Sequence, residues 1–264
     1  MRHFKAIVEY DGTDFAGFQW QHGARTVQGV LEEAIGLRTG QTTRIAGAGR
    51  TDAGVHALGQ VVSFSVATRI PAERMALALN SALPRDVTVR HVEEVDAGFH
   101  ARFSASSRIY AYLILSRRTP SALLRRYCAF TPFALDLQAM RQAAHYLIGE
   151  QDFAAFANEL TDEQTTWRDV SRLQIRGRHH LILMRIEANA FLRGMVRTIA
   201  GTLIEVGTGK RCPEEIPEIL QSRDRRRAGP SAPPQGLFLL RVRYGARRIG
   251  ARHHSEELSR WLQR

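Results

Sequence analysis

The residues best suited to chemistry lie in one short stretch, residues 49–57, which reads Gly-Arg-Thr-Asp-Ala-Gly-Val-His-Ala. Its one carboxylate, Asp52, follows Arg50 by two residues, and glycines stand on both sides of the pair. A carboxylate beside a guanidinium favours its ionised form, and glycines let a bulky ligand approach the backbone closely. Asp52 is therefore a candidate nucleophile or base. On spacing alone, a structural turn capped by Asp52 explains the stretch equally well.

The composition of the chain indicates an anionic ligand. The 264 residues include 37 Lys and Arg against 26 Asp and Glu, which gives a net charge of +11. Such an excess favours a polyanionic partner, nucleic acid before anionic lipid. Lys5 and Lys210 are the two lysines, so arginine supplies nearly all of the positive charge. Arginine suits bidentate contacts to phosphate.

The sequence does not support several other functional classes. Cys128 and Cys212 form neither a CxxC pair nor a Cys/His metal spacing. Asp52 and His56 lie four residues apart, but no third metal ligand follows at a recognised spacing, and residues 47–52 fail the dinucleotide fingerprint. No apolar run is long enough to cross a membrane, and the first residues contain no apolar signal segment. We therefore expect no metal, no cofactor, no membrane association and a cytoplasmic location.

Hydrophobic periodicity predicts the order β-α-β-β-α-β in the first half of the chain, and the second half repeats this order with one further, shorter helix. In the first half, strands are expected at 3–10, 42–46, 58–67 and 86–95, and helices at 26–37 and 71–83. In the second half, strands are expected at 108–115, 170–175, 181–188 and 237–244, and helices at 136–148, 190–206 and 213–220. This order is typical of ferredoxin-like units. It predicts an α+β fold of two ferredoxin-like domains with antiparallel sheets and a central cleft.

The same patterns give the expected domain boundaries. We expect an N-terminal α+β domain at 1–104 that carries the Asp52 loop, and a C-terminal α+β domain at 105–245. Residues 246–264 form a basic C-terminal tail in this division, which either is solvated or contacts RNA.

Five segments of the chain, in order, resemble the tRNA pseudouridine synthase A family. They are residues 49–57 above, Tyr-Asp-Gly-Thr at 10–13 with Gly-Phe-Gln at 17–19, Phe-His-Ala-Arg-Phe-Ser-Ala at 99–105 with Arg-Ile-Tyr-Ala-Tyr at 108–112, Asn-Ala-Phe-Leu-Arg-Gly-Met-Val-Arg at 189–197, and Arg-Ala-Gly-Pro-Ser-Ala-Pro at 227–233 with Gly-Leu at 236–237. The matches run from residue 4 to about residue 244. The tail after Gly245 lies outside them.

The resemblance implies an isomerase that converts uridine to pseudouridine at positions 38, 39 and 40 in the anticodon stem-loop of tRNA, without a cofactor. Asp52 would be the catalytic aspartate, and Arg50 would pair with it and help to displace the target base. Tyr110 would stack on the flipped uracil. Arg197 would come from the second domain towards the catalytic aspartate, and Leu237 would line the uracil pocket. The central cleft would then bind RNA, and the protein would be a homodimer with one tRNA spanning both subunits.

Four further residues are candidates for binding the substrate: Arg193, His56, Phe18 and Gln19. Arg193 and Arg197 are four residues apart, so within one helix they would share a face that either contacts RNA or is solvated. Phe18 and Trp20 are able to stack on bases, although aromatic residues in loops more often cover the edge of a core.

Three positions depart from the pattern of the family. Phe18 stands where tryptophan is common, and Thr198 where asparagine is common. Gly194 replaces a bulkier residue, often histidine. Inside the predicted helix 190–206, glycine is expected to cost about 1 kcal/mol of helix stability relative to alanine.

Two rival functions are compatible with the residues themselves. A catalytically inactive tRNA-binding module would carry the same charge. A nucleosidase or a metal-dependent hydrolase would use Asp52, His56 and His100. Free uracil among the products, or sensitivity to chelators, would favour the hydrolases.

Overall fold

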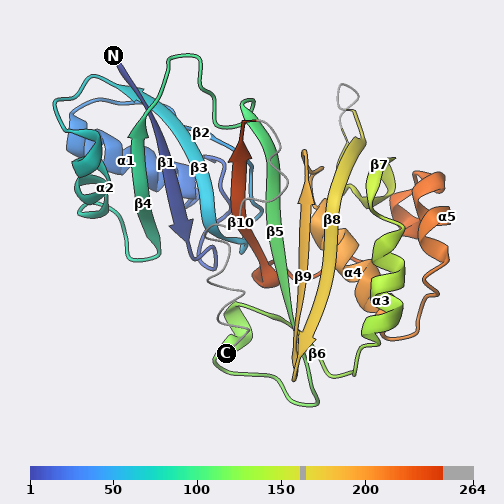
Figure 1. The fold of residues 1–264 in the computed structure, drawn as a ribbon. Coiled ribbons are helices and arrows are strands. Elements are labelled where there is room, and N and C mark those ends of the chain that lie inside the picture. Colours follow the sequence, from blue (N-terminus) through green and yellow to red (C-terminus); the bar gives the residue numbers. More distant parts are fainter. Residues whose placement is uncertain (161–164, 246–264) are drawn as a thin grey trace. The chain divides into compact units, whose positions relative to one another are not determined.

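A computed structural model describes residues 1–160 and 165–245, and the chain divides into two compact units (Figure 1). Unit 1 comprises Met1–Ser106 and the last strand from Phe238 onwards, and unit 2 comprises Ser107–Leu237. Each unit contains both helices and strands, as the α+β prediction requires. The prediction of a basic tail at 246–264 lies outside the described residues.

Unit 1 is built on a sheet with the strand order β4-β1-β3-β10. Its elements are β1 (Arg2–Tyr10), α1 (Val27–Thr39), β2 (Ala46–Gly47), β3 (His56–Val66), α2 (Ala72–Asn80), β4 (Val87–Glu94) and β10 (Leu237–Tyr244). Strand β1 is antiparallel to both β3 and β4, and the short β2 pairs with β3. The predicted order of elements in the first half is therefore confirmed.

Local sequence explains why these elements form. Strand β1 alternates, with Phe4, Ala6, Val8 and Tyr10 buried and the residues between them half-buried, the pattern of a strand with one core face. Helix α1 begins at the predicted cap, because the Thr26 hydroxyl accepts a hydrogen bond from the backbone N–H of Gly29 at 3.2 Å.

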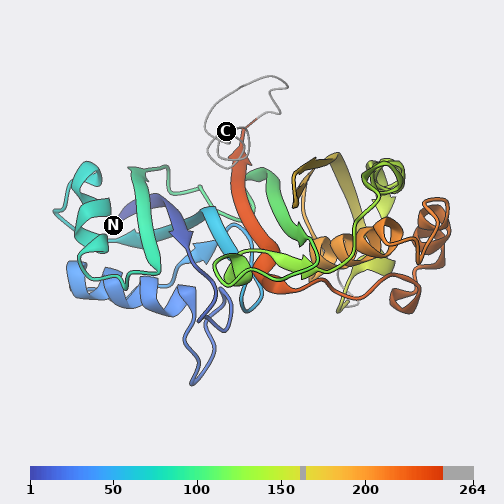
Figure 2. The same cartoon turned by 90° about the horizontal axis from the view of Figure 1, so that it is seen from below.

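In unit 2 the hydrogen-bonded strands follow the order β5-β9-β8-β7. Its strands and helices are β5 (Ala105–Ser116), β6 (Ala129–Thr131), α3 (Leu137–His145), β7 (Gly149–Asp152), β8 (Trp167–Arg178), β9 (Leu181–Ala188), α4 (Met195–Gly207) and α5 (Glu215–Ser222). 3-10 turns lie at Leu124–Arg126, Ala154–Phe156, Arg225–Arg227 and Pro234–Gly236. Strands β5, β9, β8 and β7 are antiparallel neighbours, and β6 is parallel to β5. Helix α3 packs beside α4 (Figure 2).

Three expectations about the second half need correction. The last strand, β10, was expected in the second domain, but it pairs in parallel with β3 and joins the sheet of unit 1. The predicted helix 190–206 begins only at Met195. The strand expected at 170–175 is longer, since β8 covers Trp167–Arg178; β9 has the expected bounds and is antiparallel to β8, with the turn between them at His179 and His180.

No helix within residues 1–160 and 165–245 has both the length and the apolar character that a membrane span requires.

Candidate active site

Asp52 lies on the loop between β2 and β3, and its side chain is half-buried. The backbone N–H of Val55 donates to the Asp52 carbonyl at 3.2 Å and closes a turn, in which Gly54 adopts a φ of +76°. That φ favours glycine. Arg50 is exposed on the same loop, and its predicted pairing with the Asp52 carboxylate stays a prediction.

Two glycines of the segment after β1 allow it to lie directly against the Asp52 loop. A Cβ atom on Gly12 would be 2.0 Å from the Val55 carbonyl oxygen, and one on Gly17 would be 2.9 Å from the Thr51 carbonyl oxygen. The backbone N–H of Phe18 donates to that Thr51 carbonyl at 3.0 Å. Backbone atoms on both sides of Asp52 therefore have fixed neighbours within unit 1.

His56 holds the two segments together from inside the unit. Its side chain is 2 % exposed, and its Nδ1 accepts the backbone N–H of Gly12 at 3.0 Å. The carboxylate Oδ1 of Asp11 is also 3.1 Å from Nδ1. The imidazole stacks on the ring of Phe238 with centroids 4.7 Å apart.

The two remaining candidates of unit 1 differ in accessibility. Phe18 is 2 % exposed, and its ring fills the place where a Cβ on Gly47 would lie, 2.5 Å away. Gln19 is exposed. The accessible aromatic side chain of this segment is Trp20, which is 44 % exposed and has the guanidinium of Arg44 5.2 Å from its ring. Trp20 is thus better placed than Phe18 to stack on a base.

Tyr110 and Leu237 belong to unit 2 and are nearly buried. Tyr110 lies on β5, is 7 % exposed and meets the edge of the Phe191 ring at a centroid distance of 5.1 Å. Leu237 is the last residue of unit 2 and the first of β10. Packing within the protein therefore fixes the positions of both side chains.

Arg197 lies on α4 and is bound to the loop at 228–233. Its Nε donates to the Ala232 carbonyl at 2.8 Å, and the Ala232 N–H donates to the Arg197 carbonyl at 2.9 Å. The loop lies close to the helix because Gly201 has no side chain: a Cβ there would be 1.7 Å from the Pro230 carbonyl oxygen. Arg197 thus has a defined orientation within unit 2.

The prediction that Arg193 and Arg197 share one face of a helix is wrong. Arg193 precedes α4, is exposed and forms an ion pair with Glu159. Between the two arginines, Gly194 is the N-cap of α4 with a φ of +72°. The glycine is therefore not a weak point inside a helix but the residue that permits this left-handed turn.

The sequence patterns did not single out Asn158, which connects the elements around Gly194. Its Oδ1 accepts hydrogen bonds from Thr198 Oγ1 at 3.2 Å, Ser231 Oγ at 2.9 Å and Arg225 Nε at 3.2 Å. A Cβ on Gly194 would lie 2.2 Å from Asn158 Nδ2. The signal in the sequence is the glycine itself, since a missing side chain leaves room for a neighbouring one.

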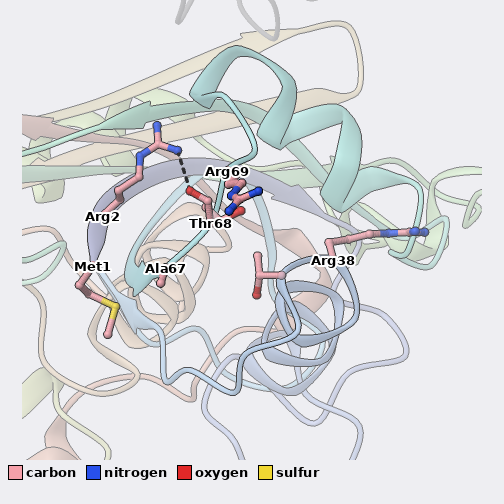
Figure 3. A pocket seen from close by; sticks show the side chains of 7 residues that line it. Met1, Arg2, Arg38, Ala67, Thr68 and Arg69 are labelled. Atoms are coloured by element: carbon pink, nitrogen blue, oxygen red, sulfur yellow. Dashed lines mark hydrogen bonds between the residues drawn. The ribbon is translucent and has the colours of Figure 1, made fainter.

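A depression of about 550 Å³ elsewhere on unit 1 contains three arginines, Arg2, Arg38 and Arg69 (Figure 3). The Arg2 guanidinium is bound to the Glu94 carboxylate at 2.7 Å and donates to the Ile70 carbonyl at 2.8 Å. None of the nine predicted site residues lines this depression.

The nine predicted residues thus fall into two groups. Unit 1 contains Asp52, Arg50, His56, Phe18 and Gln19, on two segments that are in direct backbone contact. Unit 2 contains Tyr110, Arg193, Arg197 and Leu237. Among the residues that the structure describes, no group of three or more His, Cys, Asp or Glu side chains is arranged to hold a metal ion.

Comparison with known proteins identifies the family. A family model described as tRNA pseudouridine synthase matches residues 6–104 and 143–245. The chain is 46% identical over 244 residues to the tRNA pseudouridine synthase A of Thermoanaerobacter sp. (strain X514), with 92% of this chain and 100% of that protein covered. The corresponding enzymes of Caldicellulosiruptor bescii and Brevibacillus brevis are 43% and 44% identical, each with 92% of this chain and 100% of the relative covered.

An α+β chain with one aspartate on a glycine-rich loop, similar over nearly its whole length to these enzymes, belongs to the tRNA pseudouridine synthase family. It is an isomerase that acts on tRNA and converts uridine to pseudouridine.

Proposed function

We propose that this enzyme modifies uridines 38, 39 and 40 in the anticodon stem-loop of tRNA and that Asp52 is its catalytic carboxylate. The observation that supports this most is the placement of Asp52. Its half-buried side chain projects from a loop whose backbone is bound on both sides, at Thr51 and at Val55. Such fixed geometry is what a reacting carboxylate requires.

The reaction needs few participants. The N1–C1′ bond of uridine breaks and a C5–C1′ bond forms, while C5 loses a proton and N1 gains one. No electrons or atoms from outside are required, so the proposed site needs no cofactor. One carboxylate oxygen can begin the sequence by attack on C1′ of the sugar or on C6 of the ring. Unlike glycoside hydrolysis, which commonly uses two carboxylates and water, this reaction must keep water away from C1′ of the sugar and hold the detached uracil until C5 bonds to C1′.

The other candidate residues would then prepare and hold the base. A paired or stacked uridine must flip out, at a cost of a few kcal/mol, and we propose that Arg50 helps to displace it. Tyr110 would stack on the flipped uracil, Leu237 would line its pocket, and Arg197 would bind the substrate. The sequence resemblance to the family supports these roles.

The remaining candidates of the site would support binding. We propose that Gln19 and Arg193, both exposed, contact the RNA. His56 and Phe18 would act indirectly, by fixing the loops that bind the RNA, since both side chains are buried. The net charge of +11 supports attraction of the phosphate backbone.

The architecture and assembly that the resemblance implies are also part of the proposal. We propose that both units are ferredoxin-like domains, that the enzyme is a homodimer and that it acts in the cytoplasm. The β-α-β-β-α-β order of unit 1 supports the first point.

The test uses an unmodified tRNA transcript in which uridine carries tritium at C5. Because C5 loses its hydrogen in the reaction, tritium release measures isomerisation. We expect release from uridines 38, 39 and 40, and we expect Asp52→Ala and Asp52→Asn to lower the rate on the order of a thousandfold or more. Affinity for tRNA should change little, since binding rests on many phosphate contacts.

Transcripts with cytidine at positions 38, 39 and 40 are the matched control. Release from those transcripts would contradict the proposed positions. An Asp52→Asn enzyme with nearly normal release would contradict the proposed role of the carboxylate. Free uracil in place of pseudouridine would indicate a hydrolase.

A further inference from the structure

A buried amide interrupts the core face of β3. Along that face Phe64, Val62 and Gln60 stand opposite Phe4, Ala6 and Val8 of β1, so five of the six side chains are apolar. The sixth, Gln60, is 0 % exposed. A buried polar group costs free energy unless its hydrogen bonds are satisfied, so its presence needs an explanation.

Each polar atom of Gln60 has a partner, and the main partners belong to the Asp52 loop or support it. Nε2 donates to the Gly49 carbonyl at 2.7 Å and to the Tyr10 hydroxyl at 3.4 Å. Oε1 accepts the backbone N–H of Val61 at 3.2 Å. The amide is therefore satisfied, and its stronger donor bond fixes the loop three residues before Asp52.

Tyr10 carries the connection to the residue next to Asp52. Its side chain is 3 % exposed, and its hydroxyl oxygen is 2.7 Å from Thr51 Oγ1. Burial raises the pKa of Tyr10 to about 12, so the phenol keeps its proton for hydrogen bonding at neutral pH. The network thus runs from Gln60 through Tyr10 to Thr51, and its members are all in unit 1.

The network connects the loop to β3 through specific polar groups. An apolar side chain at position 60 would match its neighbours on the same face, but it would leave the Gly49 carbonyl and the Tyr10 hydroxyl without this donor. What an apolar residue would not supply is a directional bond to Gly49 and to Tyr10. The polar network therefore defines where the loop lies, in addition to holding it in the fold.

We propose that Tyr10 and Gln60 are positioning residues for catalysis, which act through Thr51 and Gly49 to fix the Asp52 carboxylate in its reactive place. This inference rests on the proposed function of Asp52. A reacting group that moves by about 1 Å loses on the order of a hundredfold in rate. Loss of the network should therefore slow the chemical step while tRNA still binds.

Thr51 offers the sharpest test, because two substitutions separate its hydroxyl from its volume. Thr51→Val removes the hydroxyl and keeps the branched shape, whereas Thr51→Ser keeps the hydroxyl. We expect the single-turnover rate of tritium release at saturating tRNA to fall about 10- to 100-fold for Thr51→Val, and to stay within about threefold of wild type for Thr51→Ser. The dissociation constant for tRNA should remain within about threefold in both variants.

Tyr10→Phe and Gln60→Leu should lower the same rate in the same direction. Tyr244→Phe is the matched control in unit 1, since the Tyr244 hydroxyl donates to the Ala101 carbonyl at 2.8 Å and not to the Asp52 loop. It removes a hydroxyl without touching the network, so its single-turnover rate should equal that of wild type. The melting temperature of each variant shows whether it is folded at the temperature of the assay.

Three results would each be decisive. Folded Thr51→Val and Tyr10→Phe enzymes with wild-type single-turnover rates would overturn the positioning role. So would Thr51→Ser as slow as Thr51→Val, because packing and not the hydroxyl would then be responsible. A wild-type enzyme that releases no tritium from uridines 38, 39 and 40 would instead overturn the proposed function itself.

Discussion

Gly194→Ala tests how the N-terminus of α4 is held. Gly194 has a φ of +72° and a ψ of −4°, which an L-amino acid adopts at a cost of about 1–2 kcal/mol. The added Cβ would also lie 2.2 Å from Asn158 Nδ2 and 2.5 Å from Asn158 Cγ. The amide of Asn158 must therefore move away.

The second part of the cost follows from the bonds that Asn158 would lose. Its Oδ1 accepts from Thr198, Ser231 and Arg225, and a typical hydrogen bond contributes about 0.5–1.5 kcal/mol. Because Asn158 is exposed, we use the lower end, about 1–2 kcal/mol for the three. The expected loss of unfolding free energy in Gly194→Ala is therefore about 2–4 kcal/mol.

A double-mutant cycle separates the two parts. In an Asn158→Ala background the amide is already absent, so Gly194→Ala should then cost only the backbone term of about 1–2 kcal/mol. The loss of unfolding free energy in the double variant should therefore be smaller than the sum of the two single losses by about 1–2 kcal/mol. Gly40→Ala is the matched control, because Gly40 also has a positive φ, +71°, but has no atom within 4 Å of the added Cβ.

Urea unfolding, followed by circular dichroism, measures the free energy of unfolding of wild type, the two single variants, the double variant and Gly40→Ala. If the losses in the two single variants add to the loss in the double variant within about 0.3–0.5 kcal/mol, the Asn158 side chain does not collide with the new methyl group and the reasoning is refuted. Equal losses in Gly194→Ala and Gly40→Ala would refute the steric part of the argument.

Two further predictions concern titrating side chains. Burial raises the pKa of the Cys128 thiol to about 11, whereas Cys212 is exposed. At pH 8 we therefore expect iodoacetamide to alkylate Cys212 first. This prediction would be contradicted if the fast phase of alkylation were lost in Cys128→Ser and kept in Cys212→Ser. Tyr10 has its pKa raised by burial from 10.0 to about 12, so the folded state holds this proton more tightly. Its contribution is complete below pH 10 and is lost as pH rises towards 12, by about 2–3 kcal/mol. Urea unfolding between pH 9 and 11.5 should therefore show a smaller decline in Tyr10→Phe, and an identical decline would refute the assignment.

Much of unit 1 could be predicted from local patterns. The alternation in residues 3–10 and the Thr26 cap each depend on neighbours in sequence, and both are found in β1 and α1. The Asp52 loop was recognisable for a similar reason. Its glycines, its arginine and its carboxylate are consecutive, so no long-range contact is needed to bring them together.

The second unit was harder to predict where contacts distant in sequence decide the structure. Residues 190–206 have helical spacing throughout, but the left-handed Gly194 and the bonds to Asn158 delay the helix to Met195. Strand β10 is correct in extent, yet it pairs with β3, about 180 positions earlier. Periodicity identifies a strand but does not specify its partner.

The amino-acid sequence by itself determined the family, the chemistry and the residue that we propose to perform it, because these rest on residue types at short spacing. Only the tertiary structure decided that His56 and Phe18 are buried supports, that Arg193 lies outside α4, and that Gln60 and Tyr10 stand behind Asp52. The physical reason is that burial and hydrogen bonding depend on distant segments that meet only in the folded chain, and their identity is not carried by local sequence.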